Sequence, residues 1–120
     1  MIQTITPIDN TIYIERDYSS KIIEDTLSNS VIAQNEWAKL PVNERVILLQ
    51  NFVSDFLSKE SQIIEEITRQ MGRPISQAIS ELKGFKERAD YMLSIAEDKL
   101  QNIYLPEKEN FKNYIKRIPM

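Results

Sequence analysis

The sequence contains neither cysteine nor histidine among its 120 residues. Without cysteine the chain can form no disulfide, no thiolate zinc site and no cysteine nucleophile. Without histidine it has no imidazole metal ligand and lacks the commonest general base of enzymes. Only two glycines occur, Gly72 and Gly84, so no glycine-rich loop that cradles phosphate can form. Carboxylate, lysine and tyrosine chemistry is what remains.

The chain also lacks long hydrophobic runs and an excess of basic residues. No stretch approaches the roughly 18 apolar residues of a membrane span, and residues 1–10 lack the features of a signal peptide. The net charge is -3 and the basic residues are scattered, which gives no electrostatic attraction for phosphate backbones. We therefore expect a soluble, cytoplasmic protein that binds neither membranes nor nucleic acid.

Residues 1–16 alternate apolar and polar positions around a segment that favours a turn. The turn segment reads TPIDN at residues 6–10, where Pro7 presets its own φ and Asn10 tolerates left-handed backbone. This pattern predicts a β-hairpin. Two strands alone are marginal in water, so the hairpin needs a partner that covers it.

Two helices are predicted next along the chain. Ser19 or Ser20 can cap the first helix, whose imperfect apolar stripe leads towards Trp37. Pro41 suits the first position of the second helix, which we expect to run to about Ser58. Its apolar positions recur at steps of three and four residues: Val42, Val46, Leu49, Val53 and Phe56.

A third helix carries Ile63, Ile64 and Ile67 and should stop at Gly72, which favours the left-handed conformation of a helix end. Pro74 prevents its continuation. A long fourth helix is predicted over about residues 76–102. Its expected stripe consists of Ala78, Leu82, Phe85, Ala89, Met92 and Ala96.

Gly84 interrupts the fourth helix, at a cost of about 1 kcal/mol relative to alanine. Either another backbone approaches closely there, or the glycine is simply tolerated. Beyond the helix, residues 105–120 are partly alternating and lightly basic, which predicts a strand-like tail. We therefore expect one unit over residues 1–120, mainly α (α+β), with a hairpin at 1–16, helices within 19–104 and the tail at 105–120.

Few side chains in the sequence suggest a site. Two acidic pairs could bind Mg²⁺ or Ca²⁺, although solvated charge is the favoured interpretation because neither pair follows a known liganding pattern. These pairs are Glu65 with Glu66, and Glu107 with Glu109. Tyr91 and Lys99 could form a proton-transfer pair, but two helical turns would separate them by roughly 12 Å along the axis.

The basic and aromatic tail offers one further candidate. It resembles a weak nucleic-acid patch, yet a strand edge protected by lysines is the preferred interpretation. Its residues are Phe111, Lys112, Tyr114, Lys116 and Arg117. Trp37 is better explained by packing at a helix end than by a stacking platform for a ligand.

Several ordered motifs resemble the opening of the aldehyde dehydrogenase superfamily across nearly the whole chain. TPIDNT at residues 6–11 is similar to the family's hairpin turn, although Asn10 stands where glycine is usual. QNEW at 34–37 and LPVNERVILL at 40–49 resemble a helix that ends in tryptophan, followed by a helix that starts at proline. Together these two motifs are fairly specific.

Three later motifs continue the resemblance. EITRQMGRP at 66–74 looks like the family's helix end before Gly-Lys/Arg-Pro, with Gln70 and Met71 replacing a commoner acidic-threonine pair. ELKGFKERADYM at 81–92 is similar to one bacterial branch, and Glu81 matches an acidic position there. IKRIPM at 115–120 resembles the strand Arg-x-Pro-x-Gly, with Ile118 at an often acidic position and no glycine reached.

The resemblance implies oxidation of aldehydes with NAD or NADP, through a cysteine nucleophile and a glutamate base, in a full-length relative. None of the family's catalytic or cofactor residues has a counterpart in residues 1–120. The resemblance therefore implies no catalytic, cofactor-binding or metal-binding residues here. It assigns to this chain only the hairpin, covering helices and the first strand of an oligomerisation arm.

Three hypotheses follow. The first is a truncated aldehyde dehydrogenase, inactive alone, whose apolar stripes associate with a second copy or with the remaining part of the enzyme. The second is a helical adaptor of the same ancestry that binds another protein. The third, an unrelated helical domain, predicts a closed four-helix bundle without the hairpin.

Overall fold

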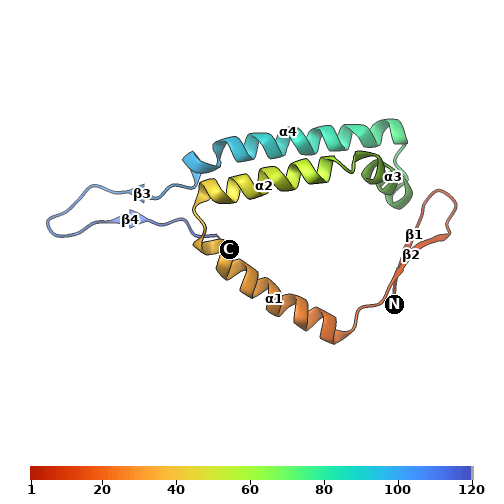
Figure 1. Cartoon of the computed structure of the whole chain (residues 1–120), viewed down its shortest axis with the longest axis horizontal. Helices are drawn as coiled ribbons and strands as arrows, with labels where there is room; N and C mark the ends of the chain where they lie inside the picture. Colours follow the sequence, from red (N-terminus) through yellow and green to blue (C-terminus); the bar gives the residue numbers. More distant parts are fainter. Residues whose placement is uncertain (120) are drawn as a thin grey trace.

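A computed structural model describes residues 1–119, which form an open frame of helices with a hairpin at each end of the sequence (Figure 1). The first hairpin joins β1 (Ile2–Ile5) to β2 (Ile12–Arg16). Four helices follow: α1 (Ser20–Lys39), α2 (Val42–Leu57), α3 (Glu60–Met71) and α4 (Ile75–Lys99). A short second hairpin joins β3 (Ile103–Tyr104) to β4 (Tyr114–Ile115). The predicted α+β class and element order are confirmed.

The first hairpin turns where the sequence predicted. Asn10 adopts a φ of 61°, so it takes the left-handed backbone for which glycine is usually needed. The side chain of Asp9 accepts hydrogen bonds from the backbone N–H and the hydroxyl of Thr11, at 3.0 and 2.7 Å. These bonds hold the pKa of Asp9 below its ordinary value. A hairpin without glycine is therefore stabilised by local side-chain contacts.

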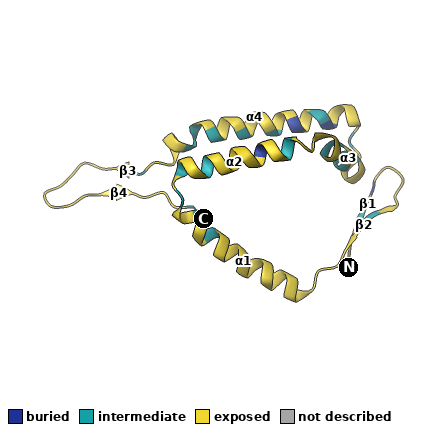
Figure 2. Ribbon diagram, in the orientation of Figure 1, coloured by how far each residue is buried: buried dark blue, intermediate teal, exposed yellow. Residues whose placement is uncertain are grey.

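Helix α1 begins as expected but packs against little. The Ser19 hydroxyl accepts a hydrogen bond from the backbone N–H of Ile22 at 3.2 Å, which confirms the predicted cap. No residue of the helix is buried, and its apolar side chains Ile23 and Leu27 are about half exposed. Figure 2 shows the whole helix as exposed apart from positions near its end. Its apolar stripe has no partner within residues 1–119.

The small core lies where antiparallel helices α2 and α4 meet (Figures 1 and 2). The buried apolar residues of the described chain are Val53 of α2 and Ala78 and Leu82 of α4. The rings of Phe56 and Phe85 extend the contact with centroids 4.9 Å apart. Helix α3 packs against α4 beside them. Three of the four helices thus share one hydrophobic contact region.

The boundaries of α2 and α4 differ slightly from the predictions. Pro41 precedes α2 rather than starting it, because its ψ of 159° is extended while its carbonyl accepts the first helical bond from Arg45. Helix α4 ends at Lys99, whereas the predicted helix continued to about residue 102. Residues 100–102 connect α4 to β3, and β3 lies within residues 19–104, which were predicted to contain only helices. Both differences concern helix ends, whose positions cannot be predicted from sequence patterns to better than one or two residues.

The structure contradicts one prediction about α4 and decides between the two alternatives for Gly84. Met92 is 57% exposed, because the buried face of a helix drifts with its 3.6-residue period and Leu93 takes the inward position instead. A Cβ added to Gly84 would meet no atom within 4 Å, so no other part of residues 1–119 approaches closely there. Gly72, in contrast, ends α3 with a φ of 70°, as predicted.

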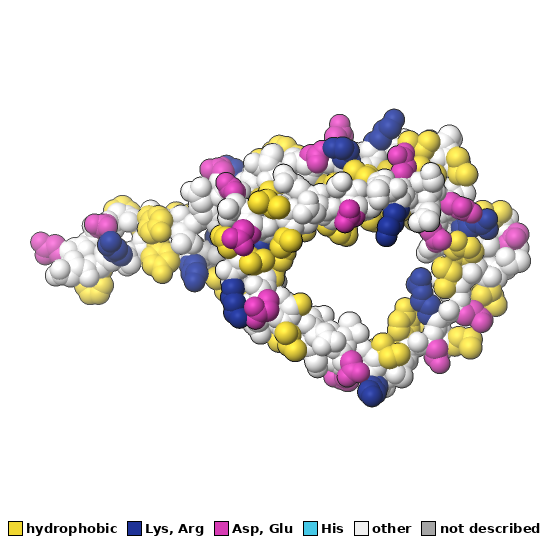
Figure 3. Space-filling model, in the orientation of Figure 1, with side chains coloured by type: hydrophobic (Ala, Val, Ile, Leu, Met, Phe, Trp, Pro, Cys, Tyr) yellow, Lys and Arg dark blue, Asp and Glu magenta, His cyan; other side chains and the backbone are white. Residues whose placement is uncertain are grey.

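The described chain is much more open than a compact domain of its length. Its radius of gyration is 20.6 Å, whereas about 14 Å is expected for 120 compact residues. Its accessible surface of 10064 Å² exceeds by about 3,300 Å² the roughly 6,700 Å² expected for a folded protein of 14.1 kDa. Figure 3 shows an open centre lined in part by hydrophobic side chains. No helix within residues 1–119 is long and apolar enough to cross a membrane.

Candidate functional site

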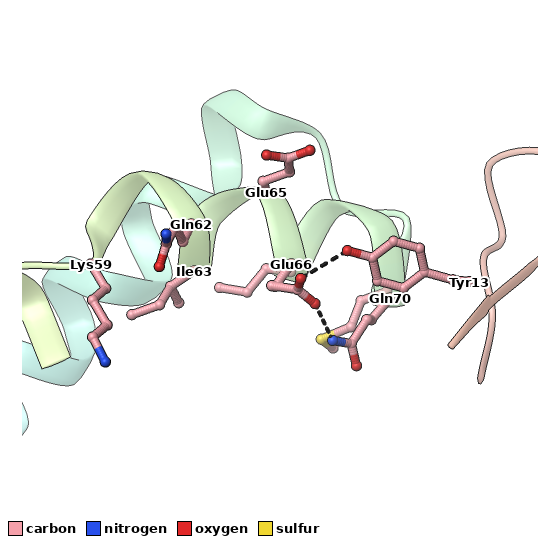
Figure 4. A pocket seen from close by; sticks show the side chains of 9 residues that line it. Tyr13, Lys59, Gln62, Ile63, Glu65, Glu66 and Gln70 are labelled. Carbon is pink, nitrogen blue, oxygen red and sulfur yellow. Dashed lines mark hydrogen bonds between the residues drawn. The ribbon is translucent and has the colours of Figure 1, made fainter. Parts of the chain in front are cut away.

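Polar contacts around Glu66 join the first hairpin to α3 (Figure 4). The hydroxyl of Tyr13 donates a hydrogen bond to Glu66 Oε1 at 2.8 Å, and Gln70 Nε2 donates to Oε2 at 2.5 Å. The guanidinium carbon of Arg69 lies 5.6 Å from the centre of the Tyr13 ring, within cation–π range. Together these contacts place the hairpin beside a shallow, solvent-open pocket on α3.

The hydrogen bond between Tyr13 and Glu66 changes the titration of both groups. It holds the pKa of Glu66 below its ordinary 4.5, with smaller support from Gln70, Arg69 and Arg16. It also raises the pKa of Tyr13 above 10.0. The Glu66 contribution to hairpin attachment is therefore complete above about pH 4.5 and lost as pH falls through the lowered pKa. The Tyr13 contribution is complete below pH 10.0 and lost as pH rises through the raised pKa.

Replacing Tyr13 with phenylalanine should raise the pKa of the Glu66 carboxyl towards 4.5, because the largest stabilising hydrogen bond to its charged form is removed. Carbon-detected NMR of the Glu66 side chain measures this change directly. Tyr91→Phe is the control, since Tyr91 is exposed on α4. An unchanged Glu66 midpoint in Tyr13→Phe would show that the hairpin is not attached in solution through this bond.

The acidic pairs do not gather into a metal site. Glu65 forms an ion pair with Arg69 at 2.9 Å, and Glu66 is occupied by its two hydrogen-bond donors. Glu107 and Glu109 lie in the loop between β3 and β4. Across residues 1–119 no three acidic side chains converge as possible ligands. The contacts of Glu65 and Glu66 therefore point to hairpin and helix stabilisation.

The structure separates the other predicted candidates. Tyr91 is exposed, and Lys99 forms an ion pair with the neighbouring Asp98 at 2.7 Å, which lowers the pKa of Asp98. In the second hairpin, Tyr114 packs against Tyr104 with ring centroids 5.7 Å apart. Phe111 remains exposed near the loop. Lys99 thus has Asp98 as its charged neighbour, and Lys116 and Arg117 line a groove to which Phe111 and Tyr114 do not contribute.

Sequence reasoning missed a groove that four separate segments create. Its walls come from the end of α1, the start of α2, the end of α4 and residues 116–119, and its volume is about 860 Å³. We call it the Arg45 groove after Arg45, one of its lining residues, whose guanidinium carbon lies 6.0 Å from the centre of the Trp37 ring. The Gln34 amide donates to the carbonyl of Pro119 at 3.1 Å, which draws the tail against α1. Trp37 therefore packs at a helix end, as the sequence suggested.

Comparisons with known proteins agree with this architecture. The aldehyde dehydrogenase family matches the chain over residues 1–120. The fold is similar to that of a succinic semialdehyde dehydrogenase from Streptococcus pyogenes solved with NADP+, with a TM-score of 0.78 and 24% identity. That match covers 93% of this chain and 25% of the other. No curated protein matches the chain.

A second solved structure gives the same result. It is a Bacillus subtilis protein described as an aldehyde dehydrogenase, matched with a TM-score of 0.75 and 22% identity over 94% of this chain and 25% of that one. At these identities the two structures establish the fold. The fold is thus an α-rich segment that spans about a quarter of a larger enzyme fold. The chain belongs to the aldehyde dehydrogenase family.

The family assignment decides between the three hypotheses. The hairpin and helix order exclude a closed four-helix bundle, and the family match over the whole chain favours a dehydrogenase segment over an adaptor. The residues 1–119 do not fit a nicotinamide dinucleotide, because their strands form only two-stranded antiparallel hairpins. Gly72 faces Pro7 and Gly84 lies within α4, so neither glycine opens a helix beneath a phosphate.

Proposed function

We propose that this chain supplies the amino-terminal framework of an aldehyde dehydrogenase and has no dehydrogenase activity alone. Two observations support this proposal: the sequence contains no cysteine that could act as nucleophile, and the described strands form two-stranded hairpins in place of the parallel sheet of dinucleotide-binding folds. The proposal assigns binding of NAD or NADP and aldehyde oxidation to the remaining part of a full-length enzyme. It treats residues 1–120 as one structural unit that acts in the cytoplasm.

The observation that carries this proposal is the unburied apolar surface. The accessible surface, polar and apolar together, exceeds that of a compact protein by about 3,300 Å², more than the roughly 1,000–2,500 Å² that each partner contributes to an obligate contact. The exposed side chains Ile23 and Leu27 of α1 and Phe52 of α2 contribute to it. The proposed partner is the remaining part of the enzyme, and in its absence a second copy of this chain.

The purified chain should therefore show no reduction of NAD or NADP with aldehydes, including succinic semialdehyde, the substrate named for the Streptococcus relative. The active enzyme from that relative serves as the positive control for the absorbance assay. In parallel, the chain should bind a hydrophobic dye and associate, as measured by light scattering. Turnover by the isolated chain would refute its inactivity. A stable monomer that does not bind the dye would refute the proposal that the chain exposes apolar surface in need of a partner.

A further inference from the structure

The Arg45 groove concentrates positive charge on a chain whose net charge is -3. Three basic side chains line it, Arg45, Lys116 and Arg117, while none of its lining residues is acidic. Charge of one sign in a concave, partly desolvated space raises the local concentration of oppositely charged ligands. The groove is therefore electrostatically suited to an anion.

Arg45 holds a buried donor that no residue in 1–119 satisfies. Its Nε is shielded from solvent and has no hydrogen-bond acceptor, although its guanidinium is fixed above Trp37. This Nε is closed to solvent, so a ligand in the groove meets the terminal N–H groups of the guanidinium, and a charged donor forms a stronger hydrogen bond than a neutral one. The planar guanidinium matches a carboxylate, which can accept two parallel hydrogen bonds.

The remaining walls are apolar enough to hold a hydrocarbon chain. Val46 and Leu49 of α2 and Leu93 of α4 line the groove beside Trp37. Its volume of about 860 Å³ lies within the roughly 300–1,000 Å³ of small-molecule sites, which combine apolar walls with a few fixed polar groups.

We propose that the Arg45 groove is a binding site for a small carboxylate that carries an apolar chain. The carboxylate accepts hydrogen bonds from the terminal N–H groups of the Arg45 guanidinium and is attracted by Lys116 and Arg117. The hydrocarbon chain lies against Leu49 and Leu93. This binding is independent of any dehydrogenase chemistry, so it stands or falls separately from the proposed framework function.

Octanoate is the probe for this site, and Trp37 is its reporter because it is the single tryptophan of the sequence and lines the groove. Titration should change the Trp37 fluorescence saturably, and the affinity should fall as salt screens the charges. Octan-1-ol, which has the same chain length and no charge, should produce a much weaker effect at equal concentration.

Arg45→Gln should weaken octanoate binding by about tenfold or more, since a charge-assisted hydrogen bond is lost. Arg88→Gln is the matched control, because Arg88 is exposed on α4 and does not line the groove. Circular dichroism verifies the fold of each variant. If Arg45→Gln unfolds, the double variant of Lys116→Gln and Arg117→Gln replaces it, with several-fold weaker binding expected.

Three results would overturn the site. If octan-1-ol changes the Trp37 fluorescence as strongly as octanoate does, the groove binds ligands only through its apolar walls. Equal octanoate affinity in the charge-removing variants and in Arg88→Gln would show that the basic residues do not bind the carboxylate. If octanoate causes no saturable change in Trp37 fluorescence in the unaltered chain, whether the chain is monomeric or self-associated, the groove is closed or is occupied by protein.

Discussion

Leu82→Ala should lower the free energy of unfolding by about 2–5 kcal/mol, the range for truncating a buried leucine. Leu82 is 4% exposed and lies on α4, the helix against which both α2 and α3 pack. Folded domains are stable by only about 5–15 kcal/mol, and this chain buries unusually little apolar surface. The substitution should therefore remove a large part of the stability of the helical unit.

Urea unfolding followed by helical circular dichroism measures the effect of Leu82→Ala as a lower midpoint. Leu48→Ala is the matched control, since Leu48 lies on α2 and is 48% exposed. Its effect should stay within about 0.5 kcal/mol, as for most surface substitutions. Equal losses in the two variants would show that α2 and α4 do not pack in solution as described.

Gly72→Ala should destabilise the chain by about 1–3 kcal/mol, for two additive reasons. The φ of 70° at Gly72 is unfavourable for any residue with a Cβ. A Cβ at this position would also lie 2.8 Å from Cγ of Pro7, closer than carbon atoms approach without a shift. The rigid proline ring cannot rotate away, so the first hairpin must move from the end of α3.

Gly84→Ala should change the stability of the chain in the opposite direction from Gly72→Ala. Gly84 lies inside α4, and an added methyl would meet no atom within 4 Å. Alanine should therefore stabilise the helix by about 1 kcal/mol. Thermal unfolding of the two variants should bracket the unaltered chain, with Gly72→Ala below it and Gly84→Ala above it. A Gly72→Ala variant as stable as Gly84→Ala would contradict the left-handed helix end and the contact with Pro7.

Local features were predictable because a few adjacent residues determine them. The turn at Asn10, the cap at Ser19 and the helix end at Gly72 each depend on backbone preferences or on hydrogen bonds within three residues. The apolar stripe predicted for α4 matches the buried residues at Ala78 and Leu82, but it does not match at Met92, which is exposed. Periodicity therefore indicated which elements form more reliably than which side chains they bury.

Contacts between segments that are distant in the sequence could not be predicted from local residue preferences. Tyr13 and Glu66 are 53 residues apart, and neither residue type identifies the other as its partner. The Arg45 groove combines four segments whose meeting depends on helix packing angles. From the sequence, Lys116 and Arg117 belonged to a strand edge protected by lysines or to a weak tail patch with Phe111, whereas in the fold both line a groove with residues of α1 and α2.

The open frame also determines how the molecule moves through solution. With principal extents of 71 × 38 × 20 Å, a single copy experiences more friction than a compact 14.1 kDa protein. A monomer would therefore diffuse more slowly and elute earlier from a sizing column than its mass suggests. Elution volume alone would imitate a dimer, so the mass of the associated state must come from scattered intensity or sedimentation equilibrium.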